Sequence, residues 1–209
     1  MSTNSQTATT PAAALAPVWR DVLATSYRAL TDAVAGVGAD QWQLITPCSE
    51  WTVTQVVQHA AADQLAYALS LGIGEGPAYD PFSPSGTVDG TPAELVAAAV
   101  EQTTAAWSTV TDAAETVPTP LPHGALPTPV AAVMCALDAA VHAWDIAIAT
   151  GQPSPLTAEL AGHLLTAATG LVEPLRQWGA YAAVVESDSA SATPVVDELL
   201  GYLGRDPRA

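Results

Sequence analysis

Three Thr-Pro pairs constrain the fold of this chain more than any other feature of its sequence. Thr91-Pro92, Thr128-Pro129 and Thr193-Pro194 each precede a segment whose apolar residues recur at helical spacing. Threonine is favoured at the N-cap of a helix, and proline fits the first helical position, where its missing N–H would have no partner. Each pair therefore predicts the start of a helix.

Further helices are predicted from apolar periodicity and from their end signals. The first runs from about Ala12 to Val37, where Gly36 and Gly38 interrupt the pattern. A second follows a possible capping box formed by Thr52 and Gln55 and extends to about residue 71.

The later part of the chain supplies the remaining elements. The segment that starts at Thr128 is predicted to end at Gly151, and another helix starts near Thr157. Residues 72–90 are dense in Gly, Pro and Asp, so we expect a long surface connection that could cover a site.

Composition narrows the architecture. Hydrophobic residues make up 49% of the chain and are largely alanine, which favours helices, whereas β-branched and aromatic runs at strand spacing are scarce. We therefore expect an all-α fold, a four-helix bundle with C-terminal helical additions. Residues 12–209 would form a single domain, with residues 1–11 as a disordered tail.

The charge of the chain excludes several classes of partner. Its formal net charge is -16, and its five basic residues are all arginine. Nucleic acids and anionic membranes require clustered cations, so neither is an expected partner. No stretch of about 18 uninterrupted apolar residues predicts a membrane span. With two cysteines and no signal-peptide pattern, the expected location is the cytoplasm.

A pair of polar residues on one predicted helix is the first candidate for a functional site. Asp138 and His142 are four residues apart, which places both at the flank of the apolar stripe of their helix. On the second helix His59 and Asp63 occupy a similar flank, so the two pairs could face each other across a groove. Two histidines with one carboxylate leave positions open on a metal ion, as in catalytic sites.

Other interpretations of these residue types stay open. An Asp and a His four residues apart on a helix can also form a solvated surface pair. His123, in a Pro-rich loop, and His163, on a later helix, are interpreted as surface or hydrogen-bonded histidines without a site role. Cys48 is interpreted as a small buried thiol in preference to an activated thiolate.

Three separated motifs carry a family resemblance. They are TPCSEWTV followed by His59, DAAVHAWDIAIATGQ, and LLGYLGRDP near the C-terminus. From the first helix to Arg205 the chain resembles the mycothiol-dependent maleylpyruvate isomerase-like proteins of the DinB metal-binding superfamily. The resemblance implies a DinB-like four-helix bundle with one divalent metal ion held by His59, Asp138 and His142.

Two positions depart from the pattern of that family. The carboxylate ligand is typically Glu and here is Asp138, shorter by one methylene, so the ion could sit differently or change identity. The usual HGWD motif has Ala143 in place of glycine, a small-for-small exchange that should be tolerated.

The resemblance implies an enzyme in which a metal-bound thiol, mycothiol, is activated as thiolate and adds to a small electrophilic molecule. The outcome would be isomerisation or S-transfer. Zn²⁺ is the expected ion, with Ni²⁺, Co²⁺, Fe²⁺ and Mn²⁺ as alternatives. Arg176 and Arg205 are the candidate cations for an anionic cosubstrate or substrate in so acidic a protein.

Two other functions are compatible with the same residues. One is a metal enzyme that uses no thiol, such as a hydrolase or a tailoring enzyme of secondary metabolism, and the other is a non-catalytic metal-binding bundle. The protein is expected to be a monomer or a homodimer. An alanine-rich, lysine-free composition also fits an actinobacterial origin, which would supply mycothiol.

Overall fold

The computed structural model describes residues 9–48, 51–186 and 192–209. Over this part of the chain the all-α prediction is confirmed, because eight helices account for the regular structure apart from one pair of two-residue strands. The helices are α1 (Pro11–Leu15), α2 (Trp19–Ala35), α3 (Val53–Ser70), α4 (Pro92–Ser108), α5 (Thr128–Thr150), α6 (Ala158–Ala168), α7 (Val172–Arg176) and α8 (Pro194–Tyr202). The strands β1 (Thr116–Val117) and β2 (Leu126–Pro127) pair antiparallel.

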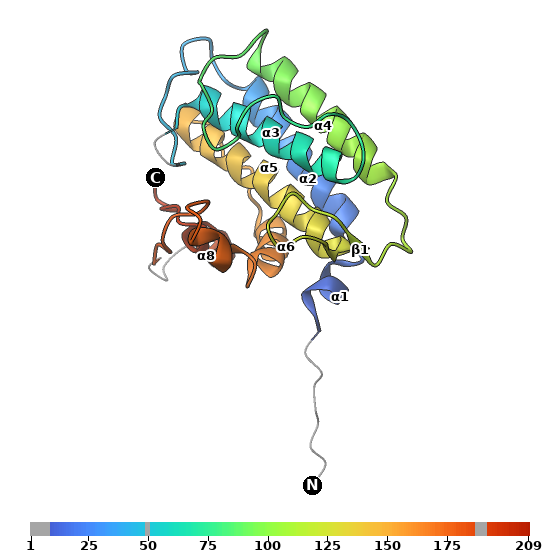
Figure 1. The fold of residues 1–209 in the computed structure, drawn as a ribbon. Helices are drawn as coiled ribbons and strands as arrows, with labels where there is room; N and C mark the ends of the chain where they lie inside the picture. The colour runs from blue at the N-terminus through green and yellow to red at the C-terminus, as the bar shows by residue number, and fades with distance from the viewer. Residues whose placement is uncertain (1–8, 49–50, 187–191) are drawn as a thin grey trace.

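The bundle consists of α2, α3, α4 and α5 (Figure 1). Helix α5 packs against both α2 and α3, and α4 closes the bundle against the same two helices. Helices α1 and α6 also pack on α5, and α8 packs on α6. The structure is therefore a DinB-like four-helix bundle with C-terminal helical additions, as the sequence predicts.

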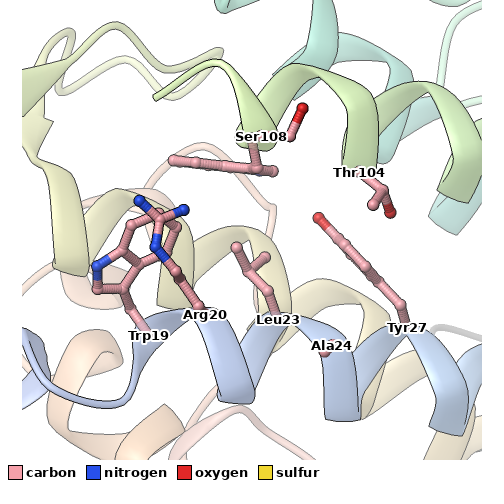
Figure 2. A pocket seen from close by; sticks show the side chains of 8 residues that line it. Trp19, Arg20, Leu23, Ala24, Tyr27, Thr104 and Ser108 are labelled. Carbon is pink, nitrogen blue, oxygen red and sulfur yellow. The ribbon is translucent and has the colours of Figure 1, made fainter. Parts of the chain in front are cut away.

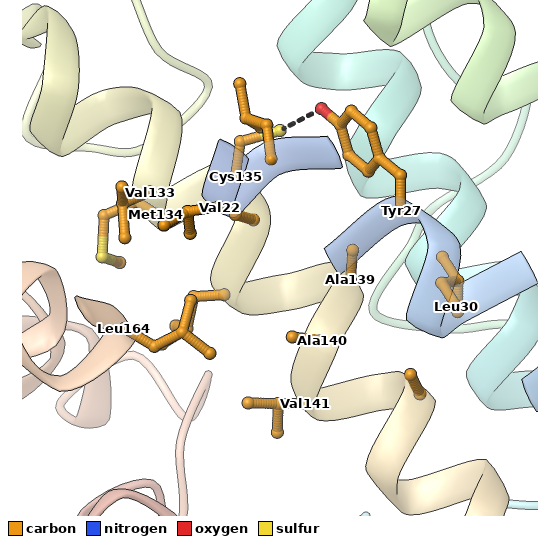
Figure 3. Packing of buried hydrophobic residues seen from close by; sticks show 14 of the residues in the cluster. Val22, Tyr27, Leu30, Val133, Met134, Cys135, Ala139, Ala140, Val141 and Leu164 are labelled. Atoms are coloured by element: carbon orange, nitrogen blue, oxygen red, sulfur yellow. Dashed lines mark hydrogen bonds between the residues drawn. The ribbon is translucent and has the colours of Figure 1, made fainter. Parts of the chain in front are cut away.

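Helix α5 is the central element of the core. Eighteen of its 23 residues are buried, many of them alanines whose small side chains let neighbouring helices approach closely. Side chains from α2, α5 and α6 meet in this core, including Leu30, Val133 and Leu164 (Figure 3). By length and composition α5 could cross a membrane, but 89% of its most apolar window is buried inside the protein, as expected of a core helix.

The prediction of one continuous first helix is wrong. The chain forms α1 and α2 with a break between them, and Pro17 lies in that break. Proline has no backbone N–H to donate, and its ring clashes with the carbonyl four residues earlier, so a helix cannot continue through it unchanged. The break lets α1 turn away from α2 and contact α5 and α6.

The predicted helix starts are correct, but the predicted side-chain caps at Thr128 and Thr193 do not form: Thr193 lies at the N-cap of α8 without a side-chain capping hydrogen bond. Thr52 caps α3 in a full capping box with Gln55, Thr91 caps α4, and Thr157 caps α6. Thr128 instead is the first residue of α5, and its hydroxyl donates to the carbonyl of Ala114. A tertiary contact has replaced the local cap there.

Helix ends and short elements show further differences. Helix α5 ends at Gly151 as predicted, and this residue adopts a left-handed φ of 73°, which glycine accepts without strain. Helix α7 and the two short strands are not predicted by the sequence patterns. The predicted tail of residues 1–11 lies mostly outside the described residues, but Pro11 already belongs to α1, whose N-cap is Thr10.

The capping box of α3 is expected to contribute measurably to stability. The Thr52 hydroxyl accepts from the Gln55 N–H at 3.3 Å, and the Gln55 side chain accepts from the Thr52 N–H at 3.0 Å. Thr52→Ala should lower the free energy of unfolding by about 1 kcal/mol in urea denaturation. Thr52→Ser should retain most of it, and equal stability of the alanine variant and the wild type would contradict the assignment.

Candidate metal centre

Three side chains from two bundle helices converge in the structure. His59 lies on α3, and Asp138 and His142 lie one turn apart on α5. The Oδ1 atom of Asp138 is 3.5 Å from Nε2 of His59 and 3.2 Å from Nε2 of His142. The structure therefore brings together the three residues that the sequence singled out as metal ligands.

The spacing of these atoms suits one small divalent ion. Ligand bonds of about 2.0–2.2 Å in a tetrahedral site place neighbouring ligand atoms about 3.3 Å apart. The two distances from Asp138 are close to this value, and the ligand atoms of all three residues lie within 4.8 Å of one another. Asp138, although shorter than Glu, reaches both histidines, because α3 and α5 pack directly on each other.

Both histidines present the same ring nitrogen to this point. Nδ1 of His59 is 2.8 Å from the carbonyl oxygen of Pro81, and Nδ1 of His142 is 2.9 Å from Oδ2 of Asp145. Neither oxygen can donate, so each Nδ1 carries the hydrogen. In the neutral rings Nε2 is then an unprotonated ligand, and second hydrogen bonds of this kind orient metal-bound histidines in proteins.

A buried ion pair between Asp145 and Arg205 contacts the Nδ1 side of His142. Asp145 is fully buried and accepts from Arg205 at 2.8 Å from Nη2 and 3.0 Å from Nε. Burial alone would raise the pKa of Asp145, but the charge of Arg205 and the hydrogen bond from His142 hold it below its ordinary value. Asp145 is therefore ionised when it orients His142.

The two other carboxyl groups near the site have different protonation states. Burial raises the pKa of Asp63 well above its ordinary value, and the charge of Asp138 raises it further. Burial also opposes ionisation of Asp138, but His142 and His59 outweigh it and lower its pKa. Ionisation is thus disfavoured at Asp63 and favoured at Asp138.

The site is partly exposed and lies beside two aromatic rings. The side chains of His59 and Asp138 are 12% and 14% exposed, so solvent reaches them. The rings of Trp51 and Phe82 lie 5.0 and 5.7 Å from that of His59, and Phe82 is largely exposed. Phe82 belongs to the long connection after α3, which the sequence predicts could cover a site.

That connection is fixed to the helix that carries His59. Gln55 donates to the carbonyl of Pro84 at 3.0 Å, and Gln58 donates to that of Thr87 at 2.8 Å. With the bond from His59 to Pro81, three side chains of α3 hold the segment in place. The segment that carries Phe82 is thus held next to His59 by side chains of α3.

Cys48, His142 and Asp145 form a second group of possible metal ligands. Arg205 occupies the space beside this group, with Nη2 3.5 Å from the Cys48 sulfur and 2.8 Å from Asp145. A cation placed there would face the guanidinium charge and would compete for Asp145. The donor chemistry therefore favours the group of His59, Asp138 and His142.

The two candidate arginines differ in position. Arg205 lies beside the site through Asp145. Arg176 instead donates to the backbone carbonyls of Ala182 and Tyr202 and pairs with Glu173. Its contacts tie the C-terminal segments together and do not bring it to the three metal-ligand candidates.

Several supporting residues were not identified from the sequence as part of the site. Asp145 is three residues from His142, a spacing that could have indicated a pair on one helix face. Gln64 and Tyr181 carry no comparable local signal. Tyr181, in the segment after α7, lies close enough for the charge of Asp138 to raise its pKa, in addition to the larger effect of burial.

A cavity lies elsewhere on the bundle. It has a volume of about 370 Å³ and is lined by side chains of α2 and α4, including Trp19, Tyr27 and Trp107 (Figure 2). None of the three metal-ligand candidates lines it. The candidate centre is therefore defined by its donor atoms and not by the size of a cavity.

Comparison with known proteins gives a family. Residues 23–147 match the model of the mycothiol maleylpyruvate isomerase N-terminal domain, a range that includes all three metal-ligand candidates. Two uncharacterized proteins of Mycobacterium tuberculosis, from strains CDC 1551 and H37Rv, are each 33% identical over 177 residues. The alignments cover 84% of this chain and 91% of each relative. No solved structure matches significantly. The chain belongs to the family of the mycothiol maleylpyruvate isomerase N-terminal domain.

Proposed function

We propose that this protein binds one divalent metal ion through His59, Asp138 and His142, and that it is an enzyme acting on a small electrophilic molecule with a thiol as cosubstrate. The observation that carries the proposal is the convergence of one carboxylate oxygen and two histidine Nε2 atoms from α3 and α5. Family membership makes mycothiol the proposed thiol, and isomerisation or S-transfer the proposed reaction.

The ligand set determines what such a centre can do. A bound divalent ion would lower the pKa of a coordinated thiol, so that thiolate forms near neutral pH. Two neutral histidines and one carboxylate leave the centre with a net positive charge and at least one open position. Zn²⁺ is the proposed ion, with Ni²⁺, Co²⁺, Fe²⁺ and Mn²⁺ as alternatives.

The surroundings of the ligands have distinct roles in this proposal. Asp145 and Arg205 keep His142 oriented, while Trp51 and Phe82 provide an apolar surface for the electrophile beside His59. Of the two arginines, Arg205 is the candidate for an anionic group of the cosubstrate, because it is the one beside the site. We further propose a cytoplasmic monomer or homodimer that does not bind nucleic acid or membranes.

Removal of one ligand should remove the metal. Purified without chelators or affinity nickel, the wild-type protein should contain about one divalent ion per chain, and His142→Ala should lose most of it. His163→Ala, the same exchange on α6, is the matched control and should keep the metal. Elemental analysis with far-UV circular dichroism checks this, and full metal content in folded His142→Ala would refute the assignment.

Metal affinity should fall as the pH is lowered. Burial alone would lower the pKa of His142, but the charge and hydrogen bond of Asp138 and the hydrogen bond from Asp145 raise it well above 6.5. Because the ion needs the neutral ring, each binding event must release a proton below that raised pKa. Chelator competition between about pH 8 and pH 6 should show weakening over the whole interval. A constant affinity would indicate a site without His142.

The exchange Asp138→Glu separates an active centre from a disused one. In the structure Asp138 already reaches both histidines, so a longer arm should push the carboxylate past its position and weaken metal binding about tenfold. The shorter carboxylate also favours a second candidate function, a non-catalytic metal-binding bundle. Tighter binding by Asp138→Glu, with no thiol-dependent turnover in either form, would support that second function.

Omission of the thiol distinguishes the proposed enzyme from a thiol-independent metal enzyme. Turnover of electrophilic substrates should require both the metal and the thiol. Activity retained in full without any thiol would replace the thiol-dependent proposal with the hydrolase or tailoring-enzyme alternative.

A further inference from the structure

A chain of buried polar side chains leads from the α2–α4 side of the bundle to Asp138. It consists of Thr103, Tyr27, Cys135 and Gln64, each of which is at most 6% exposed. Polar groups this deep in an alanine-rich core need partners, since an unpaired buried donor or acceptor costs about 1–3 kcal/mol. The partners they take therefore fix their orientation.

The pair Gln64 and Cys135 is held by two hydrogen bonds. The Cys135 thiol is 3.1 Å from Oε1 of Gln64, and Nε2 of Gln64 is 3.3 Å from the backbone carbonyl oxygen of Cys135. An amide oxygen only accepts and a carbonyl oxygen only accepts, so the thiol must donate and the amide NH₂ must face the carbonyl. Burial raises the pKa of Cys135 to about 12, so it keeps the hydrogen that it donates.

The remaining bonds take their direction from that donation. Cys135 has a single S–H hydrogen, so its sulfur accepts from the Tyr27 hydroxyl at 3.4 Å (Figure 3). The Tyr27 oxygen in turn accepts from Thr103 at 3.3 Å. Hydrogen-bond donation along this row of side chains therefore runs one way, from Thr103 to the oxygen of the Gln64 amide.

The free hydrogen of the Gln64 NH₂ group is directed at Asp138. Nε2 lies 3.5 Å from Oδ2 of Asp138, while Oδ1 of the same carboxylate faces His59 and His142. Rotation of the amide by half a turn would set Oε1 against this carboxylate and against the Cys135 carbonyl. Three acceptors would then meet without a hydrogen between them.

We infer that Gln64 is a positioning residue for Asp138, and that Cys135 sets which end of the Gln64 amide faces it. The hydrogen bond to Oδ2 leaves Oδ1 as the one oxygen turned toward the metal. This inference rests on the proposed function, because it needs Asp138 to be a metal ligand. It adds two residues to the centre that do not touch the ion.

Metal binding by three variants tests the inference. Gln64→Met keeps the length of the side chain and removes the amide, and it should weaken Co²⁺ and Zn²⁺ binding about tenfold or more in chelator competition. It should also shift the visible absorption bands of bound Co²⁺, which report ligand geometry. Cys135→Ala should weaken binding less, because the amide loses the thiol donor while the backbone carbonyl of residue 135 and Asp138 still hold its NH₂ end. Cys135→Ser, which retains a donor, should bind within about threefold of the wild type.

A loss of packing alone is excluded by a control in the core. Val34→Ala truncates a buried side chain of α2 and should lower the melting temperature without changing the metal affinity or the Co²⁺ spectrum. If Gln64→Met does not fold, the difference between Cys135→Ala and Cys135→Ser decides.

The outcomes separate the two levels of the proposal. A wild-type affinity that depends on His142, with unchanged affinity and spectrum in Gln64→Met, overturns the positioning role alone. Equal effects of Cys135→Ala and Cys135→Ser overturn the role of Cys135. Absence of His142-dependent binding in the wild type overturns the metal centre and the inference with it.

Discussion

The arrangement of the site depends on the buried carboxylate of Asp145. It accepts from Nδ1 of His142 and from the guanidinium of Arg205, and it is the point where the bundle and the C-terminal segment meet near the metal-ligand candidates. Removing Arg205 would leave the buried charge of Asp145 without its cationic partner, at a cost of about 3–5 kcal/mol. His142 therefore has little freedom to present any nitrogen but Nε2, and Asp138 and His59 complete the group around it.

Charge is distributed unevenly in and around this centre. The chain carries a net charge of -16. In the site, however, the carboxylates whose ionisation is favoured are those that contact a histidine or an arginine. Asp138 faces two histidines, Asp145 is paired with Arg205, and burial and the charge of Asp138 raise the pKa of Asp63, which disfavours a second charge there. One carboxylate thus faces two histidine nitrogens, which, with both rings neutral, would leave a bound divalent ion electropositive toward a thiol.

Local patterns in the sequence predicted much of the fold and the three metal-ligand candidates. The caps at Thr52 and Thr91 and the i, i+4 pair of Asp138 and His142 depend on neighbours within a few residues. Contacts between distant segments were not predictable in the same way: Thr128 bonds a loop carbonyl instead of capping its helix, and Arg205 reaches Asp145 across 60 residues. Pro17 is a local signal for a helix break, but the apolar periodicity on both sides of it favoured one continuous helix. In the structure the missing N–H of Pro17 ends the helix.

The central claim is that one ion lies between α3 and α5 on His59, Asp138 and His142. Anomalous X-ray diffraction from crystals of the Zn²⁺-loaded protein, recorded on both sides of the zinc absorption edge, tests it most directly. The account predicts one peak per chain, about 2.0–2.2 Å from Nε2 of both histidines and from a carboxylate oxygen of Asp138. A peak on Cys48 and Asp145, or no peak between the two helices, would contradict it.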